Sequence, residues 1–283
     1  MGLLYRMTRR LERAEALDRF AKPLAGAVGR AVRPRVVRNL LSGTNLGHPL
    51  HPILTDVPIG AWSMSVLLDT LGGPDAEPAA DLLVTTGVVA AVPTATSGLN
   101  DWADTHGAES RVGLVHATAN VAALSLYLAS LVARARGNRR SGRMLGLGGL
   151  GMLAAGGYLG GHLSYARGVN VNHTAWEQAP QEWTPALADA ELADGEHRRA
   201  DINGAPVLLH RENGQVYGLA ATCSHMGGPL DEGRVADGCV TCPWHGSTFR
   251  LTDGSIVRGP ASTPQPCYET RVRDGRIEVR LRP

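Results

Sequence analysis

Two short stretches decide the fold of the C-terminal part of the chain: CSHMGGPL at residues 223–230 and CVTCPWHGSTF at residues 239–249. Cys223 and His225 form a Cys-x-His pair, and Cys242 and His245 form a Cys-x-x-His pair. Each pair can place one thiolate and one imidazole on a metal centre. Thiolates suit zinc and iron–sulfur clusters, and imidazoles that replace two thiolates on one iron raise the reduction potential.

Small or rigid residues surround both pairs. Gly227, Gly228 and Pro229 follow the first pair, and Pro243 and Gly246 flank the second. Such residues fit two tight loops that close over a cluster.

Together with the sequence GPASTPQPCYETRV at residues 259–272, these stretches resemble the Rieske [2Fe-2S] family over roughly the last hundred residues. The resemblance implies an all-β domain that holds a [2Fe-2S] cluster. Cys223 and Cys242 would then bind one iron, and His225 and His245 would bind the other. The alternative is a zinc site, whose usual Cys2His2 pattern has both cysteines in one pair and both histidines in the other.

Four positions predict the reduction potential of the cluster. In high-potential relatives of this family an extra cysteine in each loop forms a disulfide, and here Gly228 and Trp244 stand at those positions. Phe249 stands where that group has a tyrosine that donates to a ligand sulfur, while Ser247 keeps one hydroxyl. Because fewer donors to sulfur lower the potential, we expect a value near the bottom of the range of about −150 to +300 mV.

The composition limits the classes of function. The 283 residues allow about two domains, and a net charge of +2 gives no bulk attraction to nucleic acid. Two of the four cysteines belong to the ligand pairs, which leaves Cys239 and Cys267 as packing residues and argues against a secreted disulfide framework.

Residues 1–47 are strongly basic, with three acids against these ten residues: Arg6, Arg9, Arg10, Arg13, Arg19, Lys22, Arg30, Arg33, Arg35 and Arg38. The apolar positions recur at three- and four-residue steps: Leu11, Ala14, Leu17, Phe20 and Leu24. This spacing predicts a helix with one apolar and one cationic face. Such a helix can lie on an anionic membrane surface, or it can be an ordinary solvated helix.

Three stretches of about twenty residues contain no Lys, Arg, Asp or Glu, and each is long enough to cross a bilayer: residues 82–99, 112–132 and 144–163. Residues 52–71 are a weaker fourth candidate, because Asp56 and Asp69 shorten the apolar run. A soluble bundle would alternate apolar and charged faces over such lengths, so we expect four spans. Glycines at four-residue steps in the last span, such as Gly156 and Gly160, would let helices or a flat cofactor approach closely.

Five histidines gather at one face of the membrane if the four spans are antiparallel: His48, His51, His106, His116 and His162. Ionisable residues inside membranes are costly and usually functional. His48, His51, His116 and His162 are therefore candidates for binding haem or quinone or for a proton path. The alternative is that they only form hydrogen bonds between helices.

The membrane half contains the sequences GHPLHPILTDVPIG, SGLNDW and GYLGGHLSYARGV. With them it resembles a bacterial four-helix membrane family of unknown function, which implies a topology and no activity. No apolar run follows the Arg9-Arg10 pair, as an export signal would require, and the ten N-terminal basic residues outnumber five at the other face. We expect a multi-pass protein of the cell membrane with its Rieske-like domain in the cytoplasm.

From Trp183 onward, short alternating runs are separated by strong hairpin signals at Asn213-Gly214, Asp253-Gly254 and Asp274-Gly275. This pattern predicts an antiparallel β domain that presents the two ligand loops at its tip. The chain as a whole is then multi-domain, with these parts: a basic amphipathic segment at 1–47, a four-helix transmembrane domain at 48–167, a polar linker at 168–182 and an all-β Rieske [2Fe-2S] domain at 183–283.

These features predict a membrane-tethered, low-potential Rieske protein that carries single electrons. Its partners would be membrane lipid and a redox protein, either a reductase, an oxygenase or a respiratory component. It would serve as an electron-transfer component of an oxidoreductase system, without a catalytic side chain of its own. A self-contained oxygenase is excluded because only 38 residues follow His245. The alternatives are a quinol- or haem-linked oxidoreductase subunit that uses the membrane histidines, and a membrane-anchored redox sensor.

Overall fold

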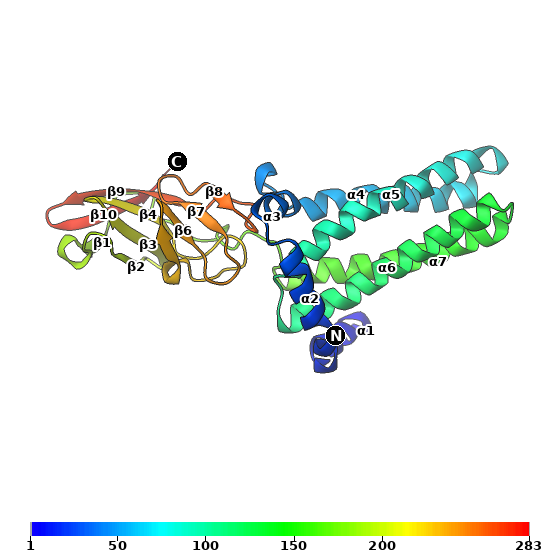
Figure 1. Cartoon of the computed structure of the whole chain (residues 1–283), viewed down its shortest axis with the longest axis horizontal. Coiled ribbons are helices and arrows are strands. Elements are labelled where there is room, and N and C mark those ends of the chain that lie inside the picture. The colour runs from blue at the N-terminus through cyan, green and yellow to red at the C-terminus, as the bar shows by residue number, and fades with distance from the viewer. Residues whose placement is uncertain (1, 283) are drawn as a thin grey trace. The chain divides into compact units, whose positions relative to one another are not determined.

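The computed structural model describes residues 2–282 and divides them into two compact units (Figure 1). One unit contains residues 2–34 and 49–169 and is helical. The other contains residues 35–48 and 170–282 and is built mainly of β-strands. The predicted order of a helical N-terminal part and an all-β C-terminal domain is confirmed.

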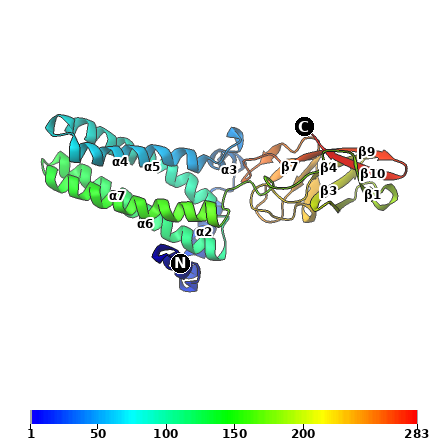
Figure 2. The same ribbon diagram turned by 180° about the vertical axis from the view of Figure 1, so that it is seen from behind.

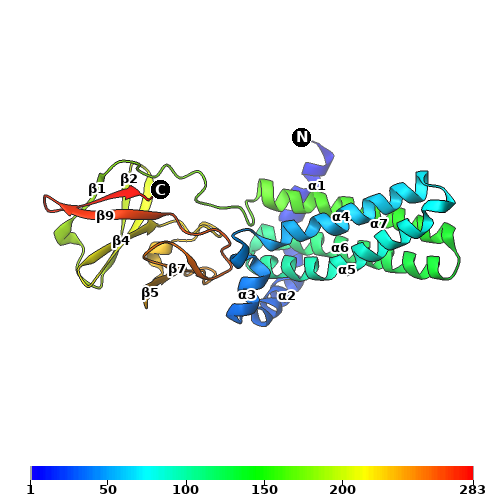
Figure 3. The ribbon, with the colours of Figure 1, turned by 90° about the horizontal axis from the view of Figure 1, so that it is seen from above.

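The helical unit has six α-helices within its described residues: α1 (Leu3–Glu12), α2 (Asp18–Ala31), α4 (Leu50–Leu71), α5 (Glu77–Trp102), α6 (Gly107–Ala135) and α7 (Arg139–Gly161). The long helices form two antiparallel hairpins, α4 with α5 and α6 with α7 (Figures 1 and 3). Gly137, with φ 76°, ends α6, and Asn138 caps α7 by accepting a hydrogen bond from the Ser141 amide. A short π-helix, η4 (His162–Ala166), continues α7.

Three helical segments are long and apolar enough to cross a membrane: Pro74–Trp102, Gly107–Ala135 and Arg139–Ala166. They contain the three strongest spans predicted from the sequence. The fourth candidate forms the helix α4, but it is not among the segments that are apolar enough to cross a membrane. Asp56 and Asp69 lie within it, so the fourth span stays a prediction.

Glycines in the bundle make room for large side chains of the neighbouring helix. A Cβ at Gly87 would lie 2.3 Å from the Trp62 ring, and one at Gly149 would lie 2.7 Å from the Tyr127 ring. These two rings are fully or almost fully buried and stack with centroids 4.3 Å apart. At the predicted positions Gly156 and Gly160, a Cβ would lie 2.8 Å from the Asn120 carboxamide and 3.0 Å from the His116 ring.

The N-terminal segment is two helices rather than one, because the chain breaks at η1 (Glu15–Leu17) between α1 and α2. Both helices are attached to α6 through Arg111, which pairs with Asp18 at 2.6 Å and donates to the Glu12 carbonyl at 2.8 Å. Hydrogen bonding to Arg111 lowers the pKa of Asp18 to about 2. Apolar side chains of both helices stay exposed: Leu3, Leu4, Met7, Phe20 and Leu24.

The β unit contains ten strands among its described residues: β1 (Thr184–Ala188), β2 (His197–Ile202), β3 (Ala205–Glu212), β4 (Gln215–Ala220), β5 (Arg234–Ala236), β6 (Cys239–Thr241), β7 (Thr248–Arg250), β8 (Ile256–Arg258), β9 (Cys267–Arg273) and β10 (Arg276–Leu281). They form a six-stranded antiparallel sheet in the order β1-β10-β9-β4-β3-β2 and a four-stranded sheet in the order β5-β6-β7-β8 (Figure 2). The first Cys/His motif lies in the loop after β4, and the second lies in the turn between β6 and β7.

The predicted hairpins are present. Asn213-Gly214 joins β3 to β4 and Asp274-Gly275 joins β9 to β10, with φ positive at both residues of each turn. Asp253-Gly254 lies between β7 and β8, which pair with an irregular register. In that turn Gly254 has a positive φ and Asp253 does not.

A short helix, α3 (Arg35–Ser42), belongs to the β unit although it precedes the bundle in the chain. The Asn39 carboxamide accepts from the Gly259 amide at 2.8 Å and donates to the Val257 carbonyl at 3.3 Å. Thr44, in the following 3-10 turn η2 (Thr44–Leu46), donates to the Ala261 carbonyl at 2.9 Å. Side chains from α3 and η2 are thereby bonded to the loop between β8 and β9.

Candidate metal centre

Two loops with the same backbone design carry the predicted ligands. In the first, the Cys223 amide donates to the Gly228 carbonyl at 2.8 Å, and the Gly227 amide donates back to the Cys223 carbonyl at 2.9 Å. The glycine has φ 71°, a conformation that side chains disfavour. His225 lies inside this closed turn.

The second loop repeats the pattern at the same spacing. The Cys242 amide donates to the Ser247 carbonyl at 2.8 Å, the Gly246 amide donates to the Cys242 carbonyl at 3.1 Å, and Gly246 has φ 75°. His245 comes directly before this glycine. Hydrogen bonds within six residues therefore fix the conformation of both loops. Because the conformation depends on so short a stretch, the motif could be predicted from the sequence.

A third loop, between β8 and β9, braces both ligand loops. The Gln265 carboxamide accepts from the Ser224 amide at 3.0 Å and donates to the Ala220 carbonyl at 2.8 Å. The Ala261 amide donates to the Ser247 hydroxyl at 3.0 Å. The sequence after the ligand motifs is thus a supporting part of the site.

The loops bring the four predicted side chains together. The Cys223 and Cys242 thiols are both buried, and they lie close enough for each to shift the pKa of the other. The rings of His225 and His245 lie with centroids 5.1 Å apart and are nearly perpendicular. His225 is 7% exposed, whereas His245 is only half-buried. The paired thiols and paired imidazoles are the donors that one binuclear centre would take.

The electrostatics of the thiols favour metal binding. The interaction between the two thiols lowers the pKa of Cys242 to about 7 and raises the pKa of Cys223. A thiolate, the form that binds metal, is therefore accessible at neutral pH. Burial lowers the pKa of His225 well below its usual value, and this keeps the imidazole neutral, as a ligand must be.

The arrangement of the donors suits a binuclear cluster, because one thiol and one imidazole come from each loop. Structural zinc sites take four ligands, whereas each iron of a [2Fe-2S] cluster takes two protein ligands beside its sulfides. Ser247 is fully buried, and in the described part of the chain its hydroxyl proton has no acceptor. That proton can be donated to a sulfur atom.

The positions that were expected to lower the potential lie where the resemblance implied. A Cβ at Gly228 would be 3.0 Å from the Trp244 ring, so the two positions of the extra cysteines are in contact. The same Cβ would be 2.9 Å from the Cys242 sulfur, which requires glycine here. Phe249 is fully buried and offers no hydroxyl.

Among the predicted membrane histidines, His51 and His116 lie near each other, with ring centroids 6.5 Å apart. His51 Nδ1 is 2.9 Å from the Thr94 carbonyl, and His116 Nδ1 is 2.8 Å from the Gly156 carbonyl. Asn120 also contacts the His116 ring, at 3.2 Å from Nε2. Each histidine thereby links two helices, which is the structural alternative to a cofactor site.

The other two histidines lie elsewhere. His162 Nε2 is 2.9 Å from the Glu12 carboxylate of α1, so it ties the N-terminal helix to the end of α7. His48 is exposed and belongs to the β unit. Binding of haem or quinone by these four residues stays a prediction.

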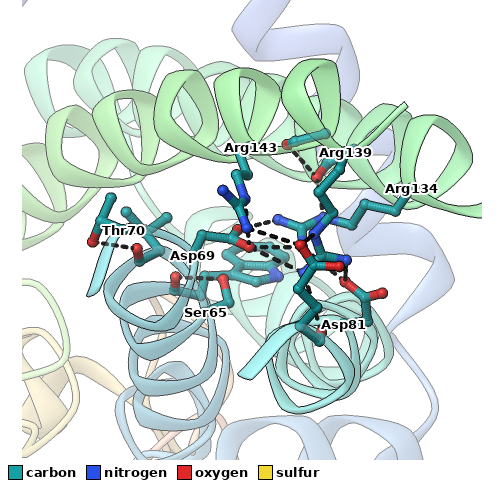
Figure 4. A network of polar contacts seen from close by, with 12 residues as sticks. Ser65, Asp69, Thr70, Asp81, Arg134, Arg139 and Arg143 are labelled. Carbon is teal, nitrogen blue, oxygen red and sulfur yellow. Dashed lines mark hydrogen bonds and ion pairs between the residues drawn. The ribbon is translucent and has the colours of Figure 1, made fainter. Parts of the chain in front are cut away.

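Sequence reasoning missed a buried ionic network at the other end of the bundle (Figure 4). Arg134 binds Asp69 with two hydrogen bonds and Asp81 with one at 2.7 Å, and Arg139 also contacts both carboxylates. Arg134 and Asp69 side chains are only 2% and 3% exposed. Asp69 was read as an interruption of a span. The sequence did offer one indication of this network. Asp69 lies near the end of α4, and Arg134 and Arg139 lie where α6 and α7 meet, so antiparallel helices can bring them together.

Comparisons with known proteins agree with this division. Residues 182–269 match the Rieske [2Fe-2S] domain, and residues 47–173 match a predicted membrane protein family, DUF2231. The anthranilate 1,2-dioxygenase ferredoxin subunit of Burkholderia cepacia is 31% identical over 100 residues, which are 35% of this chain and 93% of that protein. Ferredoxin CarAc of Metapseudomonas resinovorans is 29% identical over 35% of this chain and 94% of its own length.

Other relatives are much longer. Human apoptosis-inducing factor 3 is 30% identical over 90 residues, and the chain spans only 15% of that protein. Among solved structures, the ferredoxin of carbazole 1,9a-dioxygenase from Nocardioides aromaticivorans IC177 is 24% identical, with 36% of this chain and all of that chain covered and a TM-score of 0.34. Through its C-terminal domain, the chain belongs to the Rieske [2Fe-2S] family, and a DUF2231 membrane domain precedes that domain.

Proposed function

We propose that this protein is a membrane-tethered carrier of single electrons. The observation that carries the proposal is the pair of matched loops, which bring two thiols and two imidazoles together in a domain that is covalently joined to apolar helices. The bound [2Fe-2S] cluster supplies one-electron oxidation and reduction. Cys223 and Cys242 hold one iron, and His225 and His245 hold the other.

Electrons enter and leave through the His245 side of the site. His245 is the more exposed imidazole, and the neighbouring Trp244 is 57% exposed. An exposed aromatic ring beside a ligand suits transient contact with a partner surface, because aromatic residues are enriched in such interfaces. No side chain of this site has to form or break a covalent bond in the substrate.

The protein sets a low reduction potential. Gly228 and Trp244 replace the extra cysteines, Phe249 removes one hydroxyl donor, and Ser247 retains another. Hydrogen bonds to cluster sulfur stabilise the reduced form, so a site with few such donors has a lower potential.

The partners are redox proteins of the same compartment. The relatives that match along nearly their whole length are named as ferredoxins of dioxygenase systems. A reductase that delivers electrons and an oxygenase or respiratory component that accepts them would fit the same exposed edge.

The helical unit anchors the domain to the cell membrane as four spans, with α4 as the fourth. The exposed apolar residues of α1 and α2 and their basic neighbours suit an anionic lipid surface. The ten basic residues within residues 1–47 support a cytoplasmic N-terminus, and an even number of spans returns the Rieske domain to that side.

One observation favours a second candidate, a subunit that takes electrons from quinol. His51 and His116 lie on different helices with centroids 6.5 Å apart, and both Nδ1 atoms face backbone carbonyls. At His51 that hydrogen bond fixes the tautomer in which Nε2 has a lone pair, which can accept a proton, whereas at His116 the Asn120 carboxamide contacts Nε2.

Optical and EPR spectra of purified, iron-replete membranes test both candidates. A Rieske EPR signal without a Soret band supports the tethered carrier, and a signal that quinol reduces directly supports the second candidate. Colourless protein that holds zinc would refute both. Loss of the signal in His225→Cys and His245→Cys, with retention in His210→Asn, tests the ligand assignment.

A further inference from the structure

A cavity of about 430 Å³ opens beside the ionic network, at the end of the bundle where α6 and α7 meet. Helices α4, α5 and α7 form its wall, and the charged residues of that wall are three arginines and two carboxylates: Arg139, Arg140, Arg143, Asp69 and Glu77. Cavities of roughly 300–1,000 Å³ hold small ligands. The size and the charged wall therefore suit a small charged group.

The two carboxylates of the wall already have partners. Asp69 accepts two hydrogen bonds from Arg134 of α6, and Glu77 accepts one from Arg143 at 2.9 Å. Arg140 is exposed and has no ion-pair partner among residues 2–282. Three arginines against two carboxylates leave one positive charge of the wall unmatched.

The other two arginines of the wall keep donors that no carboxylate uses. Arg139 and Arg143 reach from α7 toward Asp69 (Figure 4). Arg139 Nε lies 3.5 Å from the Glu77 carboxylate and Arg143 Nε lies 3.7 Å from that of Asp69, and within the described residues neither Nε forms a hydrogen bond. Planar guanidinium groups pair well with phosphate oxygens, which can accept from several donors at once. The arginines of α7 therefore favour a phosphate group.

The cavity also has an apolar part, which α4 and α7 supply with Val66, Met144 and Leu147. Met144 and Leu147 are 62% and 43% exposed, and they lie in the stretch at 144–163 that has no charged residue. Along α7, Leu147 is about 10 Å from Arg140, at 1.5 Å per residue. Arg140 lies at the start of the candidate span Arg139–Ala166, so the charged part is at headgroup depth and the apolar part is at acyl-chain depth.

We propose that this cavity binds an anionic phospholipid. The phosphate lies against Arg140 and Arg143, and the acyl chains lie along Met144 and Leu147. Phosphatidylcholine also has a phosphate, but its ammonium group cancels the charge. The unmatched positive charge of the wall therefore favours a lipid with a net negative charge, as basic pockets between membrane helices do. The inference rests on the membrane anchoring proposed above, and it does not depend on electron transfer.

The test is native mass spectrometry of the full chain in detergent. The probe is dioleoylphosphatidylglycerol, and the reference is dioleoylphosphatidylcholine, which has the same acyl chains. We expect the wild type to retain the anionic lipid more tightly. Arg140→Gln should raise its dissociation constant about fivefold, the contribution of one arginine near an anionic headgroup, and Arg140→Lys should restore most of the affinity.

The matched control is Arg136→Gln, which removes an exposed arginine of the same end of the bundle that does not line the cavity. It should change the dissociation constant less than about twofold, because screening weakens more distant charges. Thermal unfolding without added lipid, followed by circular dichroism, should be the same for Arg140→Gln and the wild type, which shows that the variant is folded.

Three results would overturn the proposal. The first is equal affinity for the two lipids, and the second is an equal loss of affinity in Arg136→Gln and Arg140→Gln, which would indicate general attraction to a basic surface. The third is displacement of the anionic lipid by excess inorganic phosphate, because the cavity would then take free phosphate. A wild-type chain that is absent from the membrane fraction would instead refute the proposed anchoring.

Discussion

Replacing Ser247 with alanine tests how the buried hydroxyl acts on the cluster. The Ser247 oxygen accepts from the Ala261 amide, and its own proton is left for a sulfur atom. A hydrogen bond to a neutral group contributes about 0.5–1.5 kcal/mol, and one to a charged group about 1.5–3 kcal/mol. Since only the reduced site is negatively charged, the hydroxyl favours the reduced form by about 1 kcal/mol, and Ser247→Ala should lower the potential by about 40 mV.

The assay is the EPR-monitored redox titration, with Thr248→Val as the matched control. Thr248 is the next residue, but its hydroxyl already donates to the Gly246 carbonyl at 3.2 Å. Its removal should leave the potential unchanged. Ser247→Ala should also lower the free energy of unfolding by about 1 kcal/mol, because the Ala261 amide loses its acceptor. An unchanged potential together with this loss of stability would show that the hydroxyl only braces the loop.

Three further predictions concern the ligands, the bundle and the pH dependence of stability. His245→Cys should lower the potential or abolish the cluster, because thiolate replaces imidazole, and an unaltered EPR spectrum would contradict the assignment. Arg134→Gln leaves Asp69 buried with fewer partners and should lower the free energy of unfolding by about 3 kcal/mol, whereas Arg140→Gln, at an exposed position, should lower it little. Thermal unfolding followed by circular dichroism measures both changes. Burial lowers the pKa of His210, so the unfolded chain binds a proton that the folded chain does not, and stability should fall as the pH drops below about 6.5. His210→Asn should show a smaller loss of melting temperature between pH 7.5 and pH 5.5 than the wild type, and equal losses would exclude this cause.

The parts of the site that could be predicted from the sequence are those fixed by local bonds. Each ligand loop closes on itself within six residues, from Cys223 to Gly228 and from Cys242 to Ser247. The turns at Asn213-Gly214 and Asp274-Gly275 need positive φ at adjacent residues, and that need is visible in the residue types. The long runs without charged residues likewise identified the three apolar helices, because this signal is contained within one element.

The parts that escaped prediction depend on contacts between distant positions. Asn39 and Gly259 are 220 residues apart, and nothing in the basic segment indicates that its last part packs on the β domain. The predicted apolar face from Leu11 to Leu24 ignored the break at η1, which the bonds from Arg111 help to hold. The contact between His162 and Glu12 was not predicted, because the two residues are 150 positions apart in the sequence.

The β unit of this chain includes segments that lie on both sides of the long helices in the sequence. The aligned ferredoxins match only the β domain, along 93% and 94% of their lengths. In this chain, residues before and after the bundle supply bonds to the third loop and to the first ligand loop, at Asn39, Thr44 and His173. Because these bonds join the backbone around the ligand loops to segments on either side of α4 to α7, the β unit of this chain extends beyond the matched residues 182–269.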